Sequence, residues 1–265
     1  MRARARFAVL SAAAALILMA CGTGEGSDGS SSASGGAASS EQGTVTVYAA
    51  ASLTDSFDRL VEEFESRHPG TDVMVDYGGS TGLAQRLQEG ARADVFASAD
   101  ERIMDRLTGS DLPTGEPETF ASNTLTLVVP DGNPAGISGL NDLGKEGVNF
   151  VRCSPEVPCG AAADELEELN GVELNPVSSE HSVTDVLGKV TSGQADAGLV
   201  YATDAQAAGE RVEKIEVPHA EDVVNRYPVV KFPGSSNEAA AGDFVDLLMS
   251  ERGQDILRDE GFGAP

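Results

Sequence analysis

The stretch TVTVYAAASLTDSFDRLVEEFE, residues 44–65, contains a candidate strand and the helix that follows it. Val45 to Ala49 predicts the strand. From Ser52 to Glu65, apolar residues recur at positions 53, 57, 60, 61 and 64, which is the spacing of one buried helix face. Pro69-Gly70 then ends the helix. The stretch predicts one β-α unit of a sheet that is covered by helices.

The same alternation continues along the chain. Further strands are expected at 72–77, 94–98, 123–130, 148–152, 197–201 and 229–232, and further helices at 81–89, 100–107, 160–169, 183–191, 238–249 and 253–258. Alternating strands and helices predict an α/β protein with a mostly parallel sheet and helices on both faces. Because there are two such sets, each with its own core, we expect two lobes.

The composition excludes several classes of protein. The 265 residues include 18 Lys+Arg and 43 Asp+Glu, and the net charge is −25. Nucleic-acid binding rests on clustered Lys and Arg, so no nucleic-acid partner is expected. The excess of acidic over basic residues also argues against a domain that binds the surface of an anionic membrane. Hydrophobic residues make up 40% of the chain, which is enough for a packed core.

The N-terminus predicts export. Residues 1–20 combine three arginines with an apolar run from Ala8 to Ala20, which is typical of a signal peptide and too short to span a bilayer. Leu18-Met19-Ala20-Cys21 resembles a bacterial lipobox, which implies a lipid on Cys21. Residues 21–42 are then the lipidated cysteine and a flexible Gly/Ser tether. The expected location is extracytoplasmic, anchored by lipid alone to the outer face of the bacterial cell membrane.

Two further cysteines, Cys153 and Cys159, stand six residues apart. Outside the cytoplasm such a pair predicts a disulfide. Pro155 and Pro158 between them favour a bent, stiff connection. Closing this loop would contribute about 2–2.5 kcal/mol on the chain-entropy model. Free thiols remain the alternative, while two cysteines without a nearby histidine make a poor metal site.

Small or hydroxyl residues stand where predicted strands lead into helices: Ser52, Ser80, Cys159 and the pair Ser182-Val183. A helix N-terminus has backbone N–H groups without intrahelical partners and carries a partial positive charge. Several such ends facing one point form an anion site without Lys or Arg. In open α/β sheets, ligands bind at these turns.

The alternative is that the serines only cap helices. Ser52 with Asp55, and Ser182 with Asp185, have the spacing of an N-cap and the third helical residue. If the turns do bind an anion, a site of donors alone favours a fully deprotonated tetrahedral oxyanion, because protonated phosphate needs an acceptor. Four or more hydrogen bonds of about 1.5–3 kcal/mol each would reach micromolar affinity or better.

Five segments carry a resemblance to a known family. They are 47–53 (VYAAASL), 79–84 (GSTGLA), 93–100 (ADVFASAD), 156–160 (EVPCG) and 198–205 (GLVYATDA). From about residue 44 to 263, the chain resembles the molybdate-binding proteins of bacterial ABC transporters, which have the type II periplasmic-binding fold. The resemblance implies a monomer that captures molybdate or tungstate in a cleft between lobes and delivers it to an ABC permease. It implies no cofactor and no enzymatic activity.

The resemblance also implies which residues bind the oxyanion. Ser52 and Ser80 would donate from their hydroxyls, Cys159 and Val183 from their backbone N–H groups, and Tyr201 from its hydroxyl. Molybdenum would be bound as the oxyanion, so no side chain would coordinate the metal directly. The best-known members carry Ala at the position of Cys159. A backbone donor tolerates that difference, whereas a disulfide there bears on the position of the loop.

Two chain crossings between lobes are implied as well, near 122–123 and near 225–227. Lobe one would consist of 43–122 and 226–265, and lobe two of 123–225. Ligand would bind in the cleft and favour a hinge-closed form, and exclusion of water would strengthen a site built from neutral donors.

A serine hydrolase is one rival interpretation. Gly78 to Gly82 fits the Gly-X-Ser-X-Gly pattern with Ser80 as nucleophile, and His181 or His219 would be the base. Only two strands precede this segment after the tether, whereas a hydrolase elbow usually follows several. Both histidines are expected at the surface.

Cation and sulfate receptors are the other rivals. Tyr48, Tyr77, Tyr201 and Tyr227 are candidate phenolate ligands for iron(III), although no two are adjacent in sequence. Sulfate competes with molybdate within the oxyanion class. Because molybdate and tungstate have similar size and charge, the sequence does not indicate which of the two binds more tightly.

Overall fold

The computed structural model describes residues 43–235 and 237–265. The predicted signal peptide (1–20), the tether (21–42) and the lipidation site Cys21 lie outside these residues. Within the described ranges, no helix is both long enough and apolar enough to cross a membrane.

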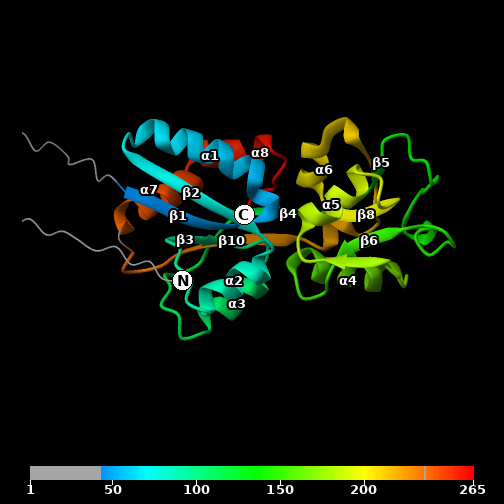
Figure 1. The fold of residues 1–265 in the computed structure, drawn as a ribbon, viewed down its shortest axis with the longest axis horizontal. Coiled ribbons are helices and arrows are strands. Elements are labelled where there is room, and N and C mark those ends of the chain that lie inside the picture. Colours follow the sequence, from blue (N-terminus) through cyan, green and yellow to red (C-terminus); the bar gives the residue numbers. More distant parts are fainter. Residues whose placement is uncertain (1–42, 236) are drawn as a thin grey trace, which may run out of the picture. The chain divides into compact units, whose positions relative to one another are not determined.

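The first of two five-stranded sheets contains the fold-deciding β-α unit. Its strands are β1 (Gly43–Ala50), β2 (Thr71–Gly78), β3 (Val95–Ala97), β4 (Glu118–Asn123) and β10 (Asn225–Lys231), in the order β2-β1-β3-β10-β4. Helices α1 (Thr54–Arg67), α7 (Glu238–Met249) and α8 (Glu251–Asp259) cover one face, and α2 (Ser80–Gln88) and α3 (Glu101–Thr108) cover the other (Figure 1).

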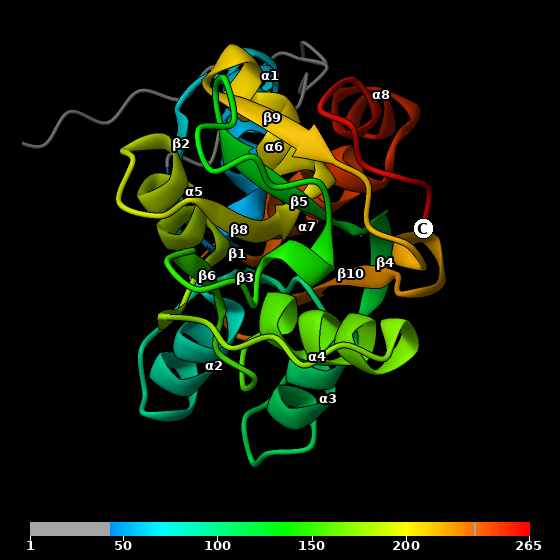
Figure 2. The ribbon, with the colours of Figure 1, turned by 90° about the vertical axis from the view of Figure 1, so that its right-hand side faces the viewer.

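The second sheet repeats this arrangement. Its strands are β5 (Leu125–Pro130), β6 (Phe150–Cys153), β7 (Ser178–Glu180), β8 (Ala197–Tyr201) and β9 (Val212–Ile215), in the order β7-β6-β8-β5-β9. Helix α4 (Pro158–Asn170) lies on one face, and α5 (Val183–Thr191) and α6 (Ala202–Ala208) lie on the other (Figure 2). Short 3-10 turns complete the described chain: η1 (Ala51–Leu53), η2 (Leu140–Asp142), η3 (Gly209–Arg211) and η4 (Ala220–Asp222).

The sheets are mixed, which refines the expectation of a mostly parallel sheet. β10 runs antiparallel to β3 and β4, and β5 runs antiparallel to β8 and β9. The chain passes from the first sheet to the second between β4 and β5, through Thr124 alone, and returns from β9 to β10. Each sheet therefore has one reversed strand, β10 in the first and β5 in the second, and each of these strands begins at a crossing.

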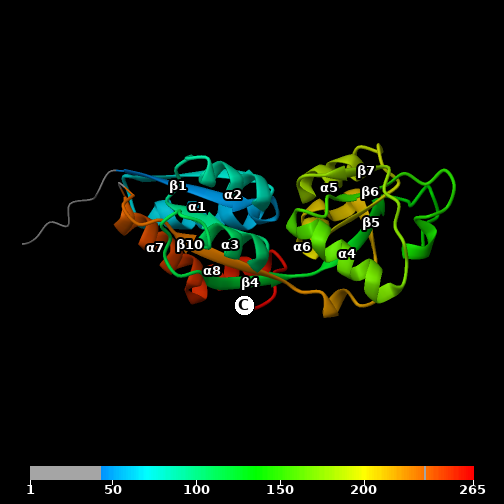
Figure 3. The same ribbon diagram turned by 90° about the horizontal axis from the view of Figure 1, so that it is seen from below.

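The two crossings lie side by side. Asn123 at the end of β4 pairs with Asn225 at the start of β10, and Figure 3 shows both segments bridging the gap between the sheets. Sheet membership supports lobe boundaries near 122–123 and 225–227, and these boundaries stay a proposal. The buried core continues from one sheet to the other, because the rings of Tyr201 and Tyr227 meet at a centroid distance of 5.9 Å.

Helix α1 shows how packing fixes the first β-α unit. Its residues Phe57, Leu60 and Phe64 are buried, as the apolar spacing predicts. Phe57 and Phe64 meet Phe244 of α7 edge to face, at centroid distances of 6.0 and 5.5 Å. Such aromatic pairs add about 0.5–1.5 kcal/mol beyond burial. The helix thereby holds the end of β1, and with it Ser52, in a fixed place.

Sequence patterns missed four elements: β4 before residue 123, the short edge strands β7 and β9, and helix α6. β4 has one large apolar residue, Phe120, and β7 has none. α6 begins directly after β8, without an intervening turn signal. β10 begins at Asn225 rather than 229, because a register irregularity between Tyr227 and Pro228 lets the strand accommodate the proline.

Candidate functional site

One small pocket brings the five predicted ligand residues together. Its cavity volume is about 20 Å³, close to the roughly 10–15 Å³ that one water molecule needs, so the space is on the scale of a small ion. Ser52 and Ser80 line it from the first sheet, and Cys159, Val183 and Tyr201 line it from the second. The other lining residues are Ala50, Ala51, Gly78, Gly79, Ala99, Val157, Pro158, His181 and Ser182.

Ser52 lies in the 3-10 turn η1, directly after β1. Helix α1 begins two residues later, at Thr54, and the side chain of Ser52 does not cap it. The capping interpretation of Ser52 with Asp55 is therefore wrong. The Ser52 hydroxyl instead lies 3.0 Å from the hydroxyl of Tyr227. This serine is free of a helix-capping role and faces the pocket.

Ser80 is the first residue of α2, after the N-cap Gly79. It is only 1% exposed, and its Oγ accepts a hydrogen bond of 3.0 Å from the backbone N–H of Ala99. Because a backbone N–H can only donate, this bond leaves the hydroxyl hydrogen of Ser80 available to another partner. The arrangement prepares Ser80 to donate into the pocket.

Cys159 lies in the first turn of α4, after Pro158, where the backbone N–H has no partner inside the helix. Its sulfur is joined to that of Cys153. Gly160 follows, and a Cβ there would collide with the carbonyl of Ser154. The disulfide and this close approach hold the loop from 153 to 159 against the end of β6.

A buried arginine supports the same loop. Arg152 is 4% exposed and donates to the carbonyl of Cys153 at 3.2 Å and to that of Gly160 at 2.9 Å. It also forms ion pairs with Asp164 and Glu167 of α4. The guanidinium thus binds both ends of the loop that presents the Cys159 amide, from behind the pocket rather than within it.

Val183 is the first residue of α5, and Ser182 is the N-cap. The Ser182 hydroxyl accepts from the backbone N–H of Asp185 at 3.2 Å and donates to the Asp185 carboxylate at 2.7 Å. The capping interpretation holds for this serine. With its hydroxyl engaged there, the backbone N–H of Val183 is the natural donor toward the pocket.

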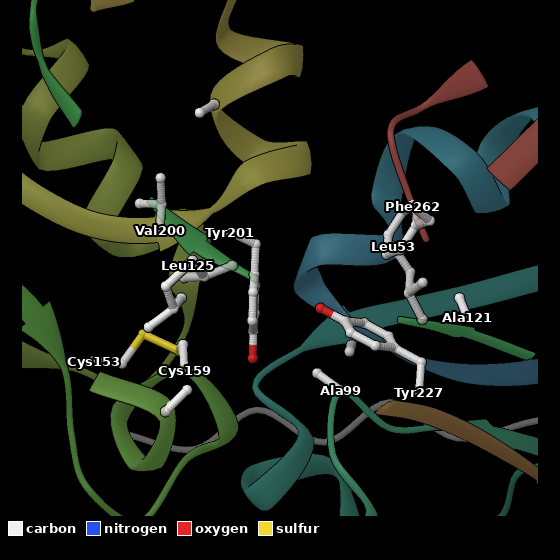
Figure 4. Packing of buried hydrophobic residues seen from close by; sticks show 14 of the residues in the cluster. Leu53, Ala99, Ala121, Leu125, Cys153, Cys159, Val200, Tyr201, Tyr227 and Phe262 are labelled. Carbon is white, nitrogen blue, oxygen red and sulfur yellow. A yellow bond between two sulfur atoms is a disulfide. The ribbon is translucent and has the colours of Figure 1, made fainter. Parts of the chain in front are cut away.

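Tyr201 ends β8 and is 1% exposed, yet its hydroxyl has no hydrogen-bond partner. A buried hydroxyl without a protein partner costs about 1–3 kcal/mol, so this one indicates a place where a ligand accepts a hydrogen bond. Burial raises the pKa of Tyr201 well above the ordinary value, which keeps the group a neutral donor. Figure 4 shows Tyr201 and Tyr227 approaching each other from opposite sides, with the disulfide on the Tyr201 side.

The described residues that line the pocket include no Lys, Arg, Asp or Glu. Its positive potential therefore comes from the starts of α2, α4 and α5 and from hydroxyl groups. Such dipoles in a site with little water attract an anion more strongly than they would in bulk solvent. The arrangement can bind a small anion.

The two histidines that the hydrolase interpretation needs as bases are not placed beside Ser80 as a base would be. The side chain of His181 is 84% exposed, although this residue also lines the pocket. His219 bonds to Asp222 at 2.8 Å. Among the described residues, the hydrogen bond of Ser80 is with the backbone N–H of Ala99 and not with a histidine. This geometry gives Ser80 no activating base.

Sequence reasoning named Tyr227 only as a candidate iron(III) ligand, and it assigned neither Tyr227 nor Asn123 to the oxyanion site. Tyr227 lies 3.0 Å from Ser52, and Asn123 donates to the Tyr227 hydroxyl at 3.5 Å. Both residues lie at the predicted chain crossings, and this position is the feature of the sequence that could have indicated their place beside the pocket. Tyr227 also pairs with Tyr201 in space, a proximity that their separation in sequence concealed.

The two sides of the pocket touch at its rim. The carbonyl of Glu156, in the loop before α4, accepts from the Thr81 hydroxyl at 2.8 Å and from the Arg102 guanidinium at 3.2 Å. A Cβ on Gly79 would collide with the carbonyl of His181. Elements of both sheets thus enclose the site.

Comparison with known proteins gives a consistent result. The family model of bacterial extracellular solute-binding proteins matches residues 45–263. The chain is 44% identical over 222 residues to the molybdate-binding protein ModA of Mycobacterium bovis, with 84% of this chain and 85% of that protein covered. It is 31% identical over 234 residues to the molybdate-binding protein ModA of Haemophilus influenzae, with 83% and 90% covered.

Among solved structures, the periplasmic molybdate-binding protein of Azotobacter vinelandii matches with a TM-score of 0.72. The sequence identity is 20%, and the match covers 83% of this chain and 99% of that one. At this identity the likeness concerns the fold, which places two mixed sheets with helices in the type II periplasmic-binding architecture.

Proposed function

Because the chain belongs to the family of bacterial extracellular solute-binding proteins, we propose that it captures molybdate or tungstate and delivers it to an ABC importer. The ligand site is the pocket between the two sheets. Ser52, Ser80 and Tyr201 donate through hydroxyls, and Cys159 and Val183 through backbone N–H groups. The relatives named above, called molybdate-binding, support this ligand class.

The unpartnered Tyr201 hydroxyl is the observation that carries the proposal. It is buried in a pocket whose other predicted ligands are also donors, and the lining supplies no charged counterpart. A fully deprotonated tetrahedral oxyanion satisfies all five donors at once. Each bond to a charged acceptor is worth about 1.5–3 kcal/mol, so the set is sufficient for micromolar binding or better.

The finer features of the proposal follow from the same role. The protein acts as a monomer, docks on the transporter permease, and reaches the membrane only through the lipid on Cys21. It works outside the cytoplasm, carries no resident cofactor and catalyses no reaction. Molybdenum is cargo, held by its oxygen atoms.

Sulfate and iron(III) are the competing ligands. Sulfate matches the donor set in charge and shape, and differs from molybdate mainly in size. Iron(III) requires phenolates, and burial raises the pKa of both Tyr201 and Tyr227, which opposes their ionisation. The oxyanion interpretation is therefore favoured over the cation receptor.

Calorimetry and thermal unfolding of the purified protein test the proposal against molybdate, tungstate, sulfate, phosphate and iron(III). Ligand at 100 times its Kd should add about 2.7 kcal/mol of stability. We expect large shifts with the first two and little with phosphate. A response to iron(III) alone would overturn the oxyanion assignment.

A pair of double variants separates the site from the fold. Ser52→Ala with Ser80→Ala should abolish the molybdate shift, because two donors to the dianion are lost. Ser66→Ala with Ser192→Ala is the matched control, since these hydroxyls bond to carbonyls of Glu63 and Lys189 one helical turn earlier. The control should keep the shift. Esterase turnover that disappears with Ser80→Ala would instead favour the hydrolase.

A further inference from the structure

The Ser52 hydroxyl stands at the end of a hydrogen-bond chain that begins at the crossing between the sheets. Asn123 donates from Nδ2 to the Thr203 hydroxyl at 2.8 Å and to the Tyr227 hydroxyl at 3.5 Å. The Tyr227 hydroxyl lies 3.0 Å from Ser52 Oγ. Asn123 and Tyr227 are 5% and 0% exposed. The chain therefore runs through the interior to the pocket.

The direction of this chain follows from one backbone group. The N–H of Thr124 donates to Asn123 Oδ1 at 3.0 Å. Because a backbone N–H cannot accept, Oδ1 is the acceptor and Nδ2 faces Tyr227. Either hydroxyl of the Tyr227–Ser52 pair can donate. Because Tyr227 already accepts from Asn123, donation from Tyr227 to Ser52 is the favoured direction. Ser52 then accepts from Tyr227 and retains its hydroxyl hydrogen for the pocket.

We propose that Asn123 and Tyr227 are positioning residues that fix Ser52 as a hydrogen-bond donor to the oxyanion and thereby make the site discriminate against protonated phosphate. The inference rests on the proposed function and adds two specificity-determining residues to it. Monoprotonated phosphate carries a hydrogen of its own, which must meet an acceptor. A site whose hydroxyls all point their hydrogens inward leaves that phosphate hydrogen unpaired.

Ser80 and Ser52 each keep a hydroxyl hydrogen for the pocket, but different groups orient them. Ser80 accepts from the backbone N–H of Ala99, a donor that no side-chain substitution removes. Ser52 depends on two side chains, so its polarity is set by the sequence and can be inverted. Burial also raises the pKa of Tyr227, because the low-dielectric interior disfavours the phenolate, and this keeps the hydrogen in the chain.

The decisive variant is Asn123→Asp, which keeps the shape but replaces the donor by an acceptor. Tyr227 would then donate to the carboxylate, Ser52 would donate to Tyr227, and a lone pair of Ser52 would face the ligand. We expect molybdate affinity to fall and the preference for molybdate over phosphate to shrink at least about tenfold, the value of one hydrogen bond of about 1.4 kcal/mol. Calorimetry with both anions at about pH 8, above the second pKa of a phosphate group, measures the ratio.

Asn225→Asp controls for the added negative charge. Asn225 is the register partner of Asn123 in the neighbouring strand, and its amide donates to the carbonyl of Ala99 rather than to Tyr227. A charge placed there repels both dianions. We expect molybdate and phosphate to weaken by a similar factor, so that their ratio stays near that of the unaltered protein.

Tyr227→Phe is the second, milder test. It keeps the ring against Phe262 and Phe120 but removes the donor to Ser52. Molybdate affinity should fall about five- to tenfold, and this effect should vanish in a Ser52→Ala background because the chain acts through Ser52. Tyr48→Phe is the control. The hydroxyl of Tyr48 accepts from Arg86 outside the pocket, so its removal should leave molybdate affinity unchanged.

Two results would overturn the positioning role. One is an equal molybdate-to-phosphate ratio in Asn123→Asp and Asn225→Asp. The other is a Tyr227→Phe effect that persists when Ser52 is Ala. Failure of the unaltered protein to bind molybdate is a different outcome, since it refutes the proposed function itself. Thermal unfolding of each variant without ligand identifies losses of affinity that come from an unstable fold.

Discussion

The two sides of the pocket supply different kinds of donor. From the first sheet come the hydroxyls of Ser52 and Ser80, whose hydrogens can rotate and are oriented by neighbours. From the second sheet come the backbone N–H groups at the starts of α4 and α5, whose directions are fixed by the helices themselves. Tyr201 adds one buried hydroxyl to that side.

The two kinds of donor need different structural support. A rotating hydroxyl requires a partner that fixes its hydrogen, and Ala99 and Tyr227 supply such partners. A backbone donor already has its direction and requires only that the helix start stay in place. The second side accordingly has the disulfide and the buried Arg152 around the loop before α4.

The largest effect expected on the second side concerns the dependence of stability on pH. Burial raises the pKa of Asp204, which accepts from the Tyr201 backbone N–H, to about 7, well above the ordinary value of a carboxyl group. The folded state holds this proton more tightly than the unfolded state, so stability falls as pH rises from about 4 to 7. Asp204→Asn should remove this loss, on the order of 4 kcal/mol above pH 7.

Urea unfolding from about pH 4 to 8 checks this expectation. The difference between Asp204→Asn and the unaltered protein should be near zero at the acid end and grow toward neutrality. Asp222→Asn is the control, because this aspartate has 58% of its side chain exposed and its loss should change stability little at any pH. A constant difference across the range would contradict a buried titration.

Removing the support behind the disulfide loop comes next in size. Arg152→Met leaves Glu167 and Asp164 without their guanidinium and releases the carbonyls of Cys153 and Gly160. We expect about 3 kcal/mol of lost stability, since breaking a buried pair leaves charge uncompensated. Arg86→Met, which removes a surface pair with Asp76, should cost under about 1 kcal/mol. Equal losses in denaturant unfolding would show that burial of Arg152 matters little.

The alternation of strands and helices and the turns that hold four of the five ligand candidates could be predicted because they rest on local patterns. The apolar face of α1 and the small residues at helix starts are written in short segments. The chain crossings and Tyr201 came from a family resemblance rather than from composition or periodicity. The mixed sheets could not be predicted from strand patterns, because the direction of β5 and β10 depends on which strands they pair with after the chain crosses between the sheets.

The orientation of Ser52 lay beyond sequence reasoning for another reason. Its spacing to Asp55 predicted a cap, but packing of α1 starts the helix at Thr54 and turns Ser52 toward Tyr227, 175 residues away. No local pattern encodes such a contact. Ser182, with the same spacing to Asp185, does cap its helix, so only tertiary structure separates the two serines.

A backbone N–H donor of the second side can be removed by substituting proline, which has no N–H. Val183 is the first residue of α5, a position that accepts proline, and Ser182 before it is extended with φ −142° and ψ 155°, as a residue before proline requires. Val183→Pro removes one N–H from the oxyanion. Calorimetry should show molybdate affinity about 10- to 100-fold weaker, as for one charge-assisted bond.

Glu251→Pro is the matched substitution outside the pocket. Glu251 is the first residue of α8, after the capping residue Ser250, so the helix start is comparable and the site is untouched. Affinity should be unchanged there. If both proline variants bound molybdate as tightly as the unaltered protein, Val183 would not be a ligand, and the contrast between hydroxyl and backbone donors would lose its second half.

The smallest expected effect concerns the contact that joins the two sides. Thr81→Val removes the 2.8 Å hydrogen bond from α2 to the Glu156 carbonyl but keeps the volume of the side chain, and Arg102 still reaches the same carbonyl. A neutral bond worth about 1 kcal/mol corresponds to roughly a fivefold change. Because Thr81 is outside the predicted ligand set, the change should appear as faster molybdate release in stopped-flow measurements, with the association rate little altered. Thr108→Val, whose hydroxyl bonds within its own helix to Asp105, should leave release unchanged. If Thr81→Val slowed association instead, the rim contact would guide ligand entry rather than hold the two sides together around it.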